Sequence, residues 1–252
     1  MGRSAYHNRQ STRASEHAGS RGASLKNKIL LSIPEAEYRV VQSCLEPFQF
    51  RQHRILHEPT QKLEFTYFLN HGLISLLVAT EDGKTVEAGM VGKEGVVGVA
   101  SAVGLTISPL RQVVQIPGEG FRVRVNALQH RLESAPRFQM ALSRYAVIQG
   151  MQVAQTAACN RLHDARERLA RWLLMAADRV SSRSLPITHD FLAAMLGTDR
   201  PSVSLAAKIL QEKNIIQYRR GALEILSRKK LESSACECYR VIQQFNGVLH
   251  LR

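Results

Sequence analysis

Residues 184–226, SLPITHDFLAAMLGTDRPSVSLAAKILQEKNIIQYRRGALEIL, contain two short helical segments followed by two extended ones. Thr188 suits the N-cap of a first helix that ends at Gly197, because a threonine oxygen accepts a backbone N–H and glycine tolerates the backbone of a helix end. A second helix runs from Arg200 to Leu210, with Pro201 in the first turn, where amides have no intrahelical partner. Two helices joined by a short turn containing glycine predict a helix-turn-helix.

The second helix has an apolar face and a polar face. The apolar positions, which can pack on Leu192 and Leu196, are Val203, Ala206, Ala207 and Leu210. Arg200, Ser202, Ser204 and Lys208 then remain available to a partner. In the docking geometry of this motif, the first residues of the second helix face base edges in the major groove. Arg200 can pair with guanine N7 and O6, whereas an ion pair with Asp199 or Glu212 is its alternative.

Two extended segments with a basic turn follow the second helix. Ile215–Tyr218 and Leu223–Leu226 are typical of strands, and the turn between them carries Arg219 and Arg220. This pattern predicts a wing whose tip adds sequence-independent affinity for the phosphate backbone. The expected DNA-binding residues are Thr188, Arg200, Pro201, Ser202, Ser204, Lys208, Arg219 and Arg220.

The formal net charge of +13 is unevenly distributed along the 252 residues. Residues 1–28 contribute +5, residues 29–160 contribute +1 and residues 161–252 contribute +7. Basic side chains release condensed counterions when they bind phosphates, so a polyanion is the natural partner of the C-terminal third. Double-stranded DNA is the expected partner, and nonspecific nucleic-acid binding without a small-molecule effector is the alternative.

A long helix is predicted to start at Pro136. Positions with three- and four-residue spacing form one stripe along it: Met140, Arg144, Val147, Met151, Ala154, Ala158, Leu162, Ala165, Leu169 and Trp172. All but Arg144 are apolar or small, so this stripe can pair with its counterpart in a second subunit. Packing on the chain's own sheet is the alternative, and both can hold for different parts. A polar cluster at 160–164 predicts a helix break and a domain boundary.

The region before this helix has the two-residue period of strands. Phe65–Leu69 and Leu73–Val78 flank Asn70-His71-Gly72 and predict one hairpin. A second hairpin joins 74–79 to 85–91 through Asp82-Gly83, a favoured pair for a type I′ turn. Glycines up to residue 120 then separate short apolar runs, which is typical of a small antiparallel barrel or roll. Residues 1–28, rich in Ser, Gly, Arg and His, are expected to form a disordered basic leader.

These segments resemble the Crp/Fnr family of bacterial transcription regulators over about residues 30–235. The resemblance is carried by Arg168–Leu174, Leu192–Gly197, Arg200–Ser204 and Ile215–Gly221. It implies an α+β fold: an N-terminal antiparallel β-roll of the cyclic-nucleotide-binding type, a long dimerisation helix and a C-terminal winged helix-turn-helix. It also implies a homodimer on a palindromic operator, a signal sensed by the roll, and RNA polymerase as a partner. Many members have an acidic residue where Pro201 stands, so the preferred operator is left open.

The resemblance gives the roll two candidate effector-binding residues, Glu94 in Gly92-Lys93-Glu94-Gly95 and Arg111 in Arg111-Gln112. The interval between them is longer than in cyclic-nucleotide binders, and Gln112 replaces a hydroxyl residue. Members with an iron–sulfur cluster use N-terminal cysteines, which residues 1–43 lack. His53, His57 and His71 leave haem ligation open, although surface histidines are the simpler interpretation. The effector is unknown, and no cofactor is assigned.

No catalytic or metal-binding residues are assigned. Asp178, His163 and Ser181 can be arranged on paper as a triad, but no nucleophile elbow accompanies them. Cys236-Glu-Cys238 lacks a second Cys/His pair nearby at zinc-site spacing, so incidental thiols are the simpler interpretation, with half of a metal site or a redox pair as alternatives. The chain is therefore expected to be a cytoplasmic regulator rather than an enzyme, without a membrane segment.

The expected organisation follows from these segments. It consists of the leader (1–28), the roll (29–135), the dimerisation helix (136–162), the winged helix-turn-helix (163–235) and a C-terminal tail (236–252).

Overall fold

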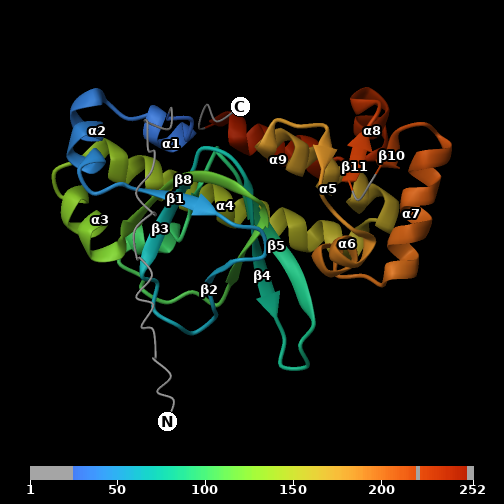
Figure 1. The fold of residues 1–252 in the computed structure, drawn as a ribbon, viewed down its shortest axis with the longest axis horizontal. Coiled ribbons are helices and arrows are strands. Elements are labelled where there is room, and N and C mark those ends of the chain that lie inside the picture. Colours follow the sequence, from blue (N-terminus) through green and yellow to red (C-terminus); the bar gives the residue numbers. More distant parts are fainter. Residues whose placement is uncertain (1–24, 220–221, 249–252) are drawn as a thin grey trace, which may run out of the picture.

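The computed structural model describes residues 25–219 and 222–248 (Figure 1). A roll of antiparallel strands is followed by a long helix and then by a mainly helical domain with a small sheet. Figure 1 shows α1, α2 and α3 at the end of the roll farthest from the C-terminal domain, and α7 at the outer edge of that domain. The predicted α+β class, with a roll, a long helix and a winged helix-turn-helix, is confirmed.

The roll contains two four-stranded antiparallel sheets within the described residues. One sheet comprises β1 (Glu46–Phe50), β8 (Gly118–Arg124), β3 (Phe65–Leu69) and β6 (Val96–Val97), in this order. The other comprises β2 (Ile55–His57), β7 (Arg111–Ile116), β4 (Leu73–Ala79) and β5 (Thr85–Val91). Apolar side chains of both sheets form a core between the sheets. This core includes Phe50, Tyr67, Leu69, Ile74, Val91 and Val114.

The hairpin predicted around Asn70–Gly72 is wrong. The strands β3 and β4 do flank this turn, but β3 pairs with β8 and β6, whereas β4 pairs with β5 and β7. The turn therefore carries the chain from one sheet to the other. Gly72 has a φ of +105°, and a Cβ there would lie 2.9 Å from the carbonyl oxygen of Ile116. The sequence marked the turn correctly, but packing between the sheets decided the strand partners.

The second predicted hairpin, between β4 and β5, is confirmed. Its turn differs from the expected type I′, because Gly83 has a positive φ of +81° and Asp82 does not. The Gly83 N–H donates to the Thr80 carbonyl at 2.9 Å, and the Thr80 N–H donates to the Lys84 carbonyl at 2.9 Å. The loop is thus a type I turn closed by a left-handed glycine, which also matches the twist of the strands.

Residues 25–28, expected in the disordered leader, belong to the folded structure. Asn27 is completely buried, and its side-chain amide donates to the carbonyls of Leu69 (3.1 Å) and Gly95 (2.9 Å). It also caps α1 (Lys28–Leu31), whose Ile29 and Leu30 enter an apolar cluster with Phe68. Residues 1–24 of the predicted leader lie outside the described residues.

Short helices that the sequence analysis did not assign cover this end of the roll. They are α1, α2 (Glu35–Gln42), η1 (Val99–Val103) and α3 (Val125–Leu132). Each has at most eight residues, too few for a helical period to stand out from a strand period. Their apolar residues pack against the start of the long helix, where Phe138 and Leu142 are fully buried.

The long helix α4 (Pro136–Leu162) has two different faces. The face on the chain's own core carries buried residues: Phe138, Leu142, Tyr145, Ile148, Gln152, Thr156 and Cys159. The predicted stripe lies on another side of the helix, and Met140, Val147, Met151 and Leu162 are 46–75% exposed there. A different face of α4 therefore packs on the chain's own core, and pairing of the exposed stripe with a second subunit stays a prediction. The stripe ends at Leu162, because Leu169 and Trp172 lie in the next helix and are buried.

The predicted break at 160–164 is confirmed. The helix α4 ends at Leu162, and α5 (Ala165–Val180) begins behind an Asp164 cap. The Asp164 carboxylate accepts the Glu167 N–H at 2.8 Å, and the Glu167 carboxylate accepts the Asp164 N–H at 3.3 Å. This capping box fixes the start of α5. Arg168 donates to the carbonyls of Asn160 and Leu196, both at 3.1 Å, which holds the break against the following domain.

The C-terminal domain consists of α5, α6 (His189–Leu196), α7 (Arg200–Glu212) and α8 (Arg228–Ser234) with a small antiparallel sheet. The sheet has the order β10 (Ile216–Arg219), β11 (Ala222–Ile225), β9 (Ser184–Leu185). Ser184 pairs with Glu224 at the sheet edge. Leu73, Leu77, Met90 and Ile116 of the roll share one apolar cluster with this domain, so the two parts are packed into a continuous core.

Residues 238–248, expected to be part of a tail, form helix α9 (Cys238–Val248). This helix packs along α4, and the Gln152 side chain donates to Asn246 Oδ1 at 2.7 Å. Ile242 of α9 is fully buried. The chain therefore returns from the C-terminal domain to the long helix.

Candidate nucleic-acid interface

The first helix of the motif, α6, starts and ends as the sequence predicts. Thr188 Oγ1 accepts the Phe191 N–H at 3.3 Å, and Asp190 stands in the first turn. Gly197 ends the helix in the left-handed conformation, with a φ of +57°. A Cβ at this glycine would also lie 2.8 Å from Val86 Cγ2 of β5. The turn of the motif is therefore packed directly against the roll.

The second helix, α7, is capped by Asp199, whose carboxylate accepts the Ser202 N–H at 2.7 Å and the Ser202 hydroxyl at 2.8 Å. Val203, Ala206, Ala207 and Leu210 are buried, as predicted. The outward side carries Arg200, Pro201, Leu205, Lys208 and Glu212. A solvent-exposed side therefore runs the whole length of α7.

The predicted contact residues of α7 differ in how strongly their side chains are already bonded to other residues of the domain. Arg200 pairs with Asp190 of α6 (Nε to Oδ1, 3.2 Å), which differs from both partners considered in the sequence analysis. The two side chains are 65% and 70% exposed, so this pair is weakly held and can exchange for a base. Lys208 lies 3.8 Å from Glu212 on the same exposed face. The two serines are partly occupied within the domain, Ser202 by the cap and Ser204 by His189.

His189 was not singled out from the sequence. Its Nδ1 lies 3.0 Å from Ser204 Oγ, and its ring stands edge-on to Tyr218 of the wing at 4.7 Å between ring centroids. Burial, followed by the positive charge of Arg200, lowers the pKa of His189, so the ring is uncharged near pH 7. His189 therefore links α6, α7 and the wing and positions Ser204.

Leu205 is the second residue that the sequence analysis missed. It is 61% exposed in the middle of the outward side of α7. Its place four residues after Pro201 was a signal for this face, because residues at i and i+4 share one side of a helix. An apolar side chain at such a position can contact the methyl group of thymine in the major groove.

The predicted wing is present as β10 and β11, with each strand moved by about one residue from its expected limits. Arg219, at the end of β10, is exposed and lies 3.6 Å from Glu224 (Nε to Oε2). Arg220, the other predicted wing residue, lies outside the described residues. The wing stands beside α6 and α7 through the contact between His189 and Tyr218.

The two candidate effector residues, Glu94 and Arg111, bind different partners in different parts of the structure. Glu94 is buried beside α5, where its Oε1 lies 3.0 Å from Arg179 Nε. Arg111 Nε lies 2.8 Å from Glu58 Oε2 on the second sheet of the roll. Arg111 does not line the cavity that Glu94 lines. The described structure therefore does not bring these residues into one effector pocket.

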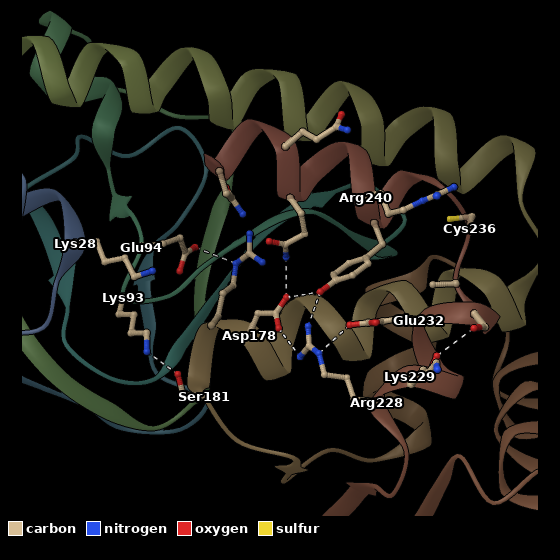
Figure 2. Close-up of a pocket in the computed structure, with 17 residues that line it drawn as sticks. Lys28, Lys93, Glu94, Asp178, Ser181, Arg228, Lys229, Glu232, Cys236 and Arg240 are labelled. Carbon is tan, nitrogen blue, oxygen red and sulfur yellow. Dashed lines mark hydrogen bonds and ion pairs between the residues drawn. The ribbon is translucent and has the colours of Figure 1, made fainter. Parts of the chain in front are cut away.

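Glu94 lines a cavity of about 1250 Å³ between the roll, α5, α8 and α9 (Figure 2). Several of its charged groups bond to other residues of the same lining. Arg228 Nη1 lies 2.7 Å from Asp178 Oδ1, and the Lys93 ammonium donates to Ser181 Oγ at 2.5 Å. The cavity is thus a polar seam where the roll meets the C-terminal domain.

The three residues considered as a triad have unrelated partners. Asp178 pairs with Arg228 and accepts the Tyr239 hydroxyl at 2.8 Å. His163 Nε2 lies 3.3 Å from Glu237, and Ser181 contacts Lys93. These contacts give Ser181 no histidine base. Among the described residues, no helix is long and apolar enough to cross a membrane.

Comparisons with known proteins agree with this architecture. Residues 167–234, from α5 to α8, match the family model of the Crp-like helix-turn-helix domain. FixK2 from Bradyrhizobium japonicum is similar in fold, with 15% identity, coverage of 76% of this chain and 98% of that one, and a TM-score of 0.66. The c-di-GMP-responsive regulator CLP of Xanthomonas campestris has 14% identity, coverage of 77% and 100%, and a TM-score of 0.64.

A CRP-family transcriptional regulator from Thermus thermophilus is also similar, with 20% identity, coverage of 75% and 96%, and a TM-score of 0.61. No curated protein matches the sequence. The resemblance inferred from the sequence is confirmed in the fold, and the C-terminal segment is a Crp-like helix-turn-helix domain. The chain shares its fold with solved structures of CRP- and Crp/Fnr-family regulators.

Proposed function

We propose that this protein is a sequence-specific DNA-binding regulator that acts as a homodimer on a palindromic operator. The observation that carries the proposal is the outward side of α7, where Arg200, Leu205 and Lys208 are exposed while the opposite side is buried. Arg200 at the start of the helix is the base-reading residue, and Leu205 contacts bases through apolar surface. The remaining predicted residues lie close to this end of the helix and determine how it fits the groove. They are Thr188, Pro201, Ser202 and Ser204.

Lys208, Arg219 and Arg220 supply contacts to phosphates. The first two are exposed and held only by surface ion pairs, which cost little to exchange. Charged groups of this kind bind every sequence with similar affinity and make binding dependent on salt. Specific and nonspecific binding are therefore carried by different residues, which makes the alternative function testable.

The homodimer is supported by the exposed stripe of α4. Met140, Arg144, Val147, Met151, Ala154 and Ala158 follow one another at alternating steps of four and three residues, the spacing of a two-stranded coil. The large apolar members are about half exposed in the single chain. A second copy of the same helix would cover them and relate the two α7 helices by a two-fold axis. Half-sites about 34 Å apart follow from that symmetry.

Signal sensing belongs to the roll in this proposal, with RNA polymerase as the further partner of the DNA-bound dimer. Two buried polar contacts join the strand β5 of the roll to α5 and provide a route between the domains. Trp172 Nε1 donates to Glu87 Oε1 at 2.8 Å, and Arg179 Nε donates to the Met90 carbonyl at 3.2 Å. A change in the strand β5 would therefore move the helix that supports the DNA-binding motif.

The test is selection of bound duplexes from a random library with the purified full-length protein, followed by affinity measurements on the selected sequence. We expect a palindromic motif. Arg200→Ala should lose about 1–3 kcal/mol of discrimination at one base pair of each half-site, with nonspecific binding retained. Lys208→Ala and Arg219→Ala should weaken all sequences alike and reduce the salt slope by about one each.

Arg39→Ala is the matched control, because Arg39 is an exposed arginine in an ion pair on α2, at the other end of the molecule. It should leave the selected motif and the affinity unchanged. If no motif is enriched and Arg200→Ala behaves like Lys208→Ala, the protein binds nucleic acid nonspecifically and the proposal fails.

A further inference from the structure

Four metal-ligating side chains meet where α4 ends and α9 begins. Cys159 and His163 are four residues apart at the end of α4, and Cys236 and Cys238 flank Glu237 in the segment before and at the start of α9. Their sulfur and nitrogen ligand atoms all lie within 4.8 Å of one another. Figure 2 labels Cys236 on the segment that leads into α9, at the edge of the interdomain cavity.

Two of the distances between these atoms are close to the edges of a small tetrahedron. Cys159 Sγ lies 3.5 Å from Cys236 Sγ, and Cys238 Sγ lies 3.7 Å from His163 Nδ1. Zinc binds sulfur at about 2.3 Å and nitrogen at about 2.0–2.1 Å in tetrahedral sites. Tetrahedral angles then place two sulfurs about 3.8 Å apart and a sulfur and a nitrogen about 3.5 Å apart. All four atoms lie within 4.8 Å of one another, so a single ion fits between them if the most distant atoms approach by at most about 1 Å.

The surroundings also suit a metal. Cys159, Cys236 and Cys238 are at most 5% exposed, so bulk water does not compete for the site. His163 faces Cys238 with Nδ1, while its Nε2 lies 3.3 Å from Glu237 Oε1. A histidine ligand whose other ring nitrogen donates to a carboxylate is the usual outer-shell arrangement at zinc sites. The Gln155 amide donates to Cys238 Sγ at 3.0 Å, a contact that a thiolate accepts well.

Charge is balanced as well. Three thiolates and one divalent cation leave a net charge of about −1, which a buried site must offset. The guanidinium of Arg171 is 3% exposed and acts electrostatically on Cys159. This arginine donates to Thr156 Oγ1 at 3.3 Å, one turn before Cys159 on α4.

We propose that Cys159, His163, Cys236 and Cys238 bind one zinc ion in a closed, structural Cys3His site. The softness of three thiolates and an imidazole, together with the tetrahedral spacing, selects zinc over magnesium or calcium. The ion cross-links the end of α4 to the start of α9, across the break that separates the long helix from the C-terminal domain. It holds α9 against α4 and fixes the direction in which α5 leaves the long helix. This inference does not depend on DNA binding.

From the sequence, incidental thiols were the simpler interpretation and half of a metal site or a redox pair the alternatives, because Cys236-Glu-Cys238 has no neighbouring Cys/His pair. The second pair comes from 77 residues earlier in the chain, since Cys159 and Cys236 are that far apart. The antiparallel return of α9 along α4 brings the two halves together. A disulfide between Cys159 and Cys236 is the competing outcome, and the experiment separates the two.

The first measurement is metal content of the untagged full-length protein, purified without chelator and with a thiol-free reductant. We expect about one zinc per chain in the wild type and in Cys44→Ser, because Cys44 lies in the roll outside the site. Cys159→Ser, Cys236→Ser and His163→Asn should each lose at least four fifths of the zinc. Replacement by Co²⁺ should give the intense thiolate-to-cobalt band and the visible bands of a tetrahedral ion, in the wild type and in Cys44→Ser alike.

Two further measurements keep the test valid if a ligand variant misfolds. Glu237→Gln changes an exposed side chain, so it should retain one zinc at saturation while the affinity falls about 10–100-fold. In the wild-type protein, removal of zinc by a chelator should speed hydrogen exchange in residues 236–248 by at least about tenfold, and added zinc should reverse it. No such effect is expected in residues 65–69 of the roll.

Other results would overturn the proposal. A wild-type protein with no zinc, no Co²⁺ spectrum and four titratable thiols has no metal site. Iron with labile sulfide would show a cluster in place of a single ion. A mass two hydrogens lower than expected, with Cys159 linked to Cys236 in peptide maps and no bound metal, would show a disulfide.

Discussion

Glu87 is a carboxyl group enclosed between the roll and the DNA-binding domain. Its oxygens accept hydrogen bonds from Trp172 Nε1 and from the Ser75 hydroxyl. Burial raises the pKa of Glu87 to about 7, although these hydrogen bonds and the charges of Arg171 and Arg179 oppose the rise. The protein therefore holds a proton at the domain contact under mildly acidic conditions.

This pKa predicts a pH-dependent stability. The unfolded chain loses the Glu87 proton near pH 4.5 and the native state loses it near pH 7, so the native state binds more protons between these values. The contribution of Glu87 to the free energy of unfolding is then largest below pH 4.5 and falls as the pH rises to about 7. Its total change is about 3 kcal/mol, at about 1.4 kcal/mol per pKa unit.

Glu87→Gln should remove this dependence while keeping both contacts, because the amide oxygen can accept from Trp172 Nε1 and the amide N–H can donate to the Ser75 oxygen. Measured by urea unfolding at fixed protein concentration, the stability of the variant relative to wild type should rise by about 3 kcal/mol from about pH 4.5 to about pH 8. Glu119→Gln, an exposed carboxyl in β8, is the control and should change the difference little. Parallel stability curves for wild type and Glu87→Gln would show that Glu87 is ionised throughout.

At the scale of elements, the helix α4 has one buried face and one exposed apolar face. Its inner face belongs to the core of the chain, and its outer stripe is left exposed at Met140, Val147, Met151 and Leu162. Leaving an apolar side chain of this size in water costs about 1.5–3 kcal/mol compared with burying it fully. The stripe therefore predicts self-association through α4.

Val147→Glu combined with Met151→Glu should separate the dimer. Two carboxylates per chain would enter the interface between helices, and burial of unpaired charge opposes association strongly. We expect the dissociation constant of the dimer to rise at least about 100-fold, measured by analytical ultracentrifugation. Gln139→Glu adds charge at an exposed position of α4 outside the stripe and should leave the dimer intact. A monomeric wild type, or a double variant that remains dimeric, would place the interface elsewhere.

At the scale of the whole molecule, the roll and the C-terminal domain share one apolar cluster. Trp172 is the single tryptophan of the chain, it is 2% exposed, and it donates to Glu87 across the domain contact. Its fluorescence thus reports the junction, whereas far-UV circular dichroism reports all helices. This position makes the coupling between the domains measurable without a label.

The shared core predicts a single cooperative unfolding transition. The midpoints in urea from Trp172 fluorescence and from circular dichroism should coincide at fixed protein concentration, as two-state unfolding requires. Leu77→Ala removes a buried roll side chain of this cluster and should cost about 2–5 kcal/mol of stability. Both midpoints should therefore fall together. A fluorescence transition that clearly precedes the loss of helix would show that the domains separate before they unfold.

The sequence alone determined the local structure of the DNA-binding motif. Thr188, Gly197 and Asp199 act through bonds to residues within a few positions, so caps and turns can be predicted from neighbours. The buried face of α7 follows from the helical period, and the break before α5 follows from the polar cluster at 160–164, whose last residue, Asp164, caps α5. The outer stripe of α4 was likewise visible, because spacing along one helix fixes a face.

The tertiary structure decided which distant segments meet. The strands beside Asn70–Gly72 go to different sheets, and Glu94 faces Arg179 while Arg111 faces Glu58. Cys159 and His163 meet Cys236 and Cys238 only because α9 folds back on α4. The physical reason is common to these cases: caps and periods are set by short-range bonds and geometry, whereas long-range partners are set by the burial of whole faces. The candidate DNA-reading surface can therefore be predicted from neighbouring residues in the sequence. The candidate metal site forms only when the chain has folded.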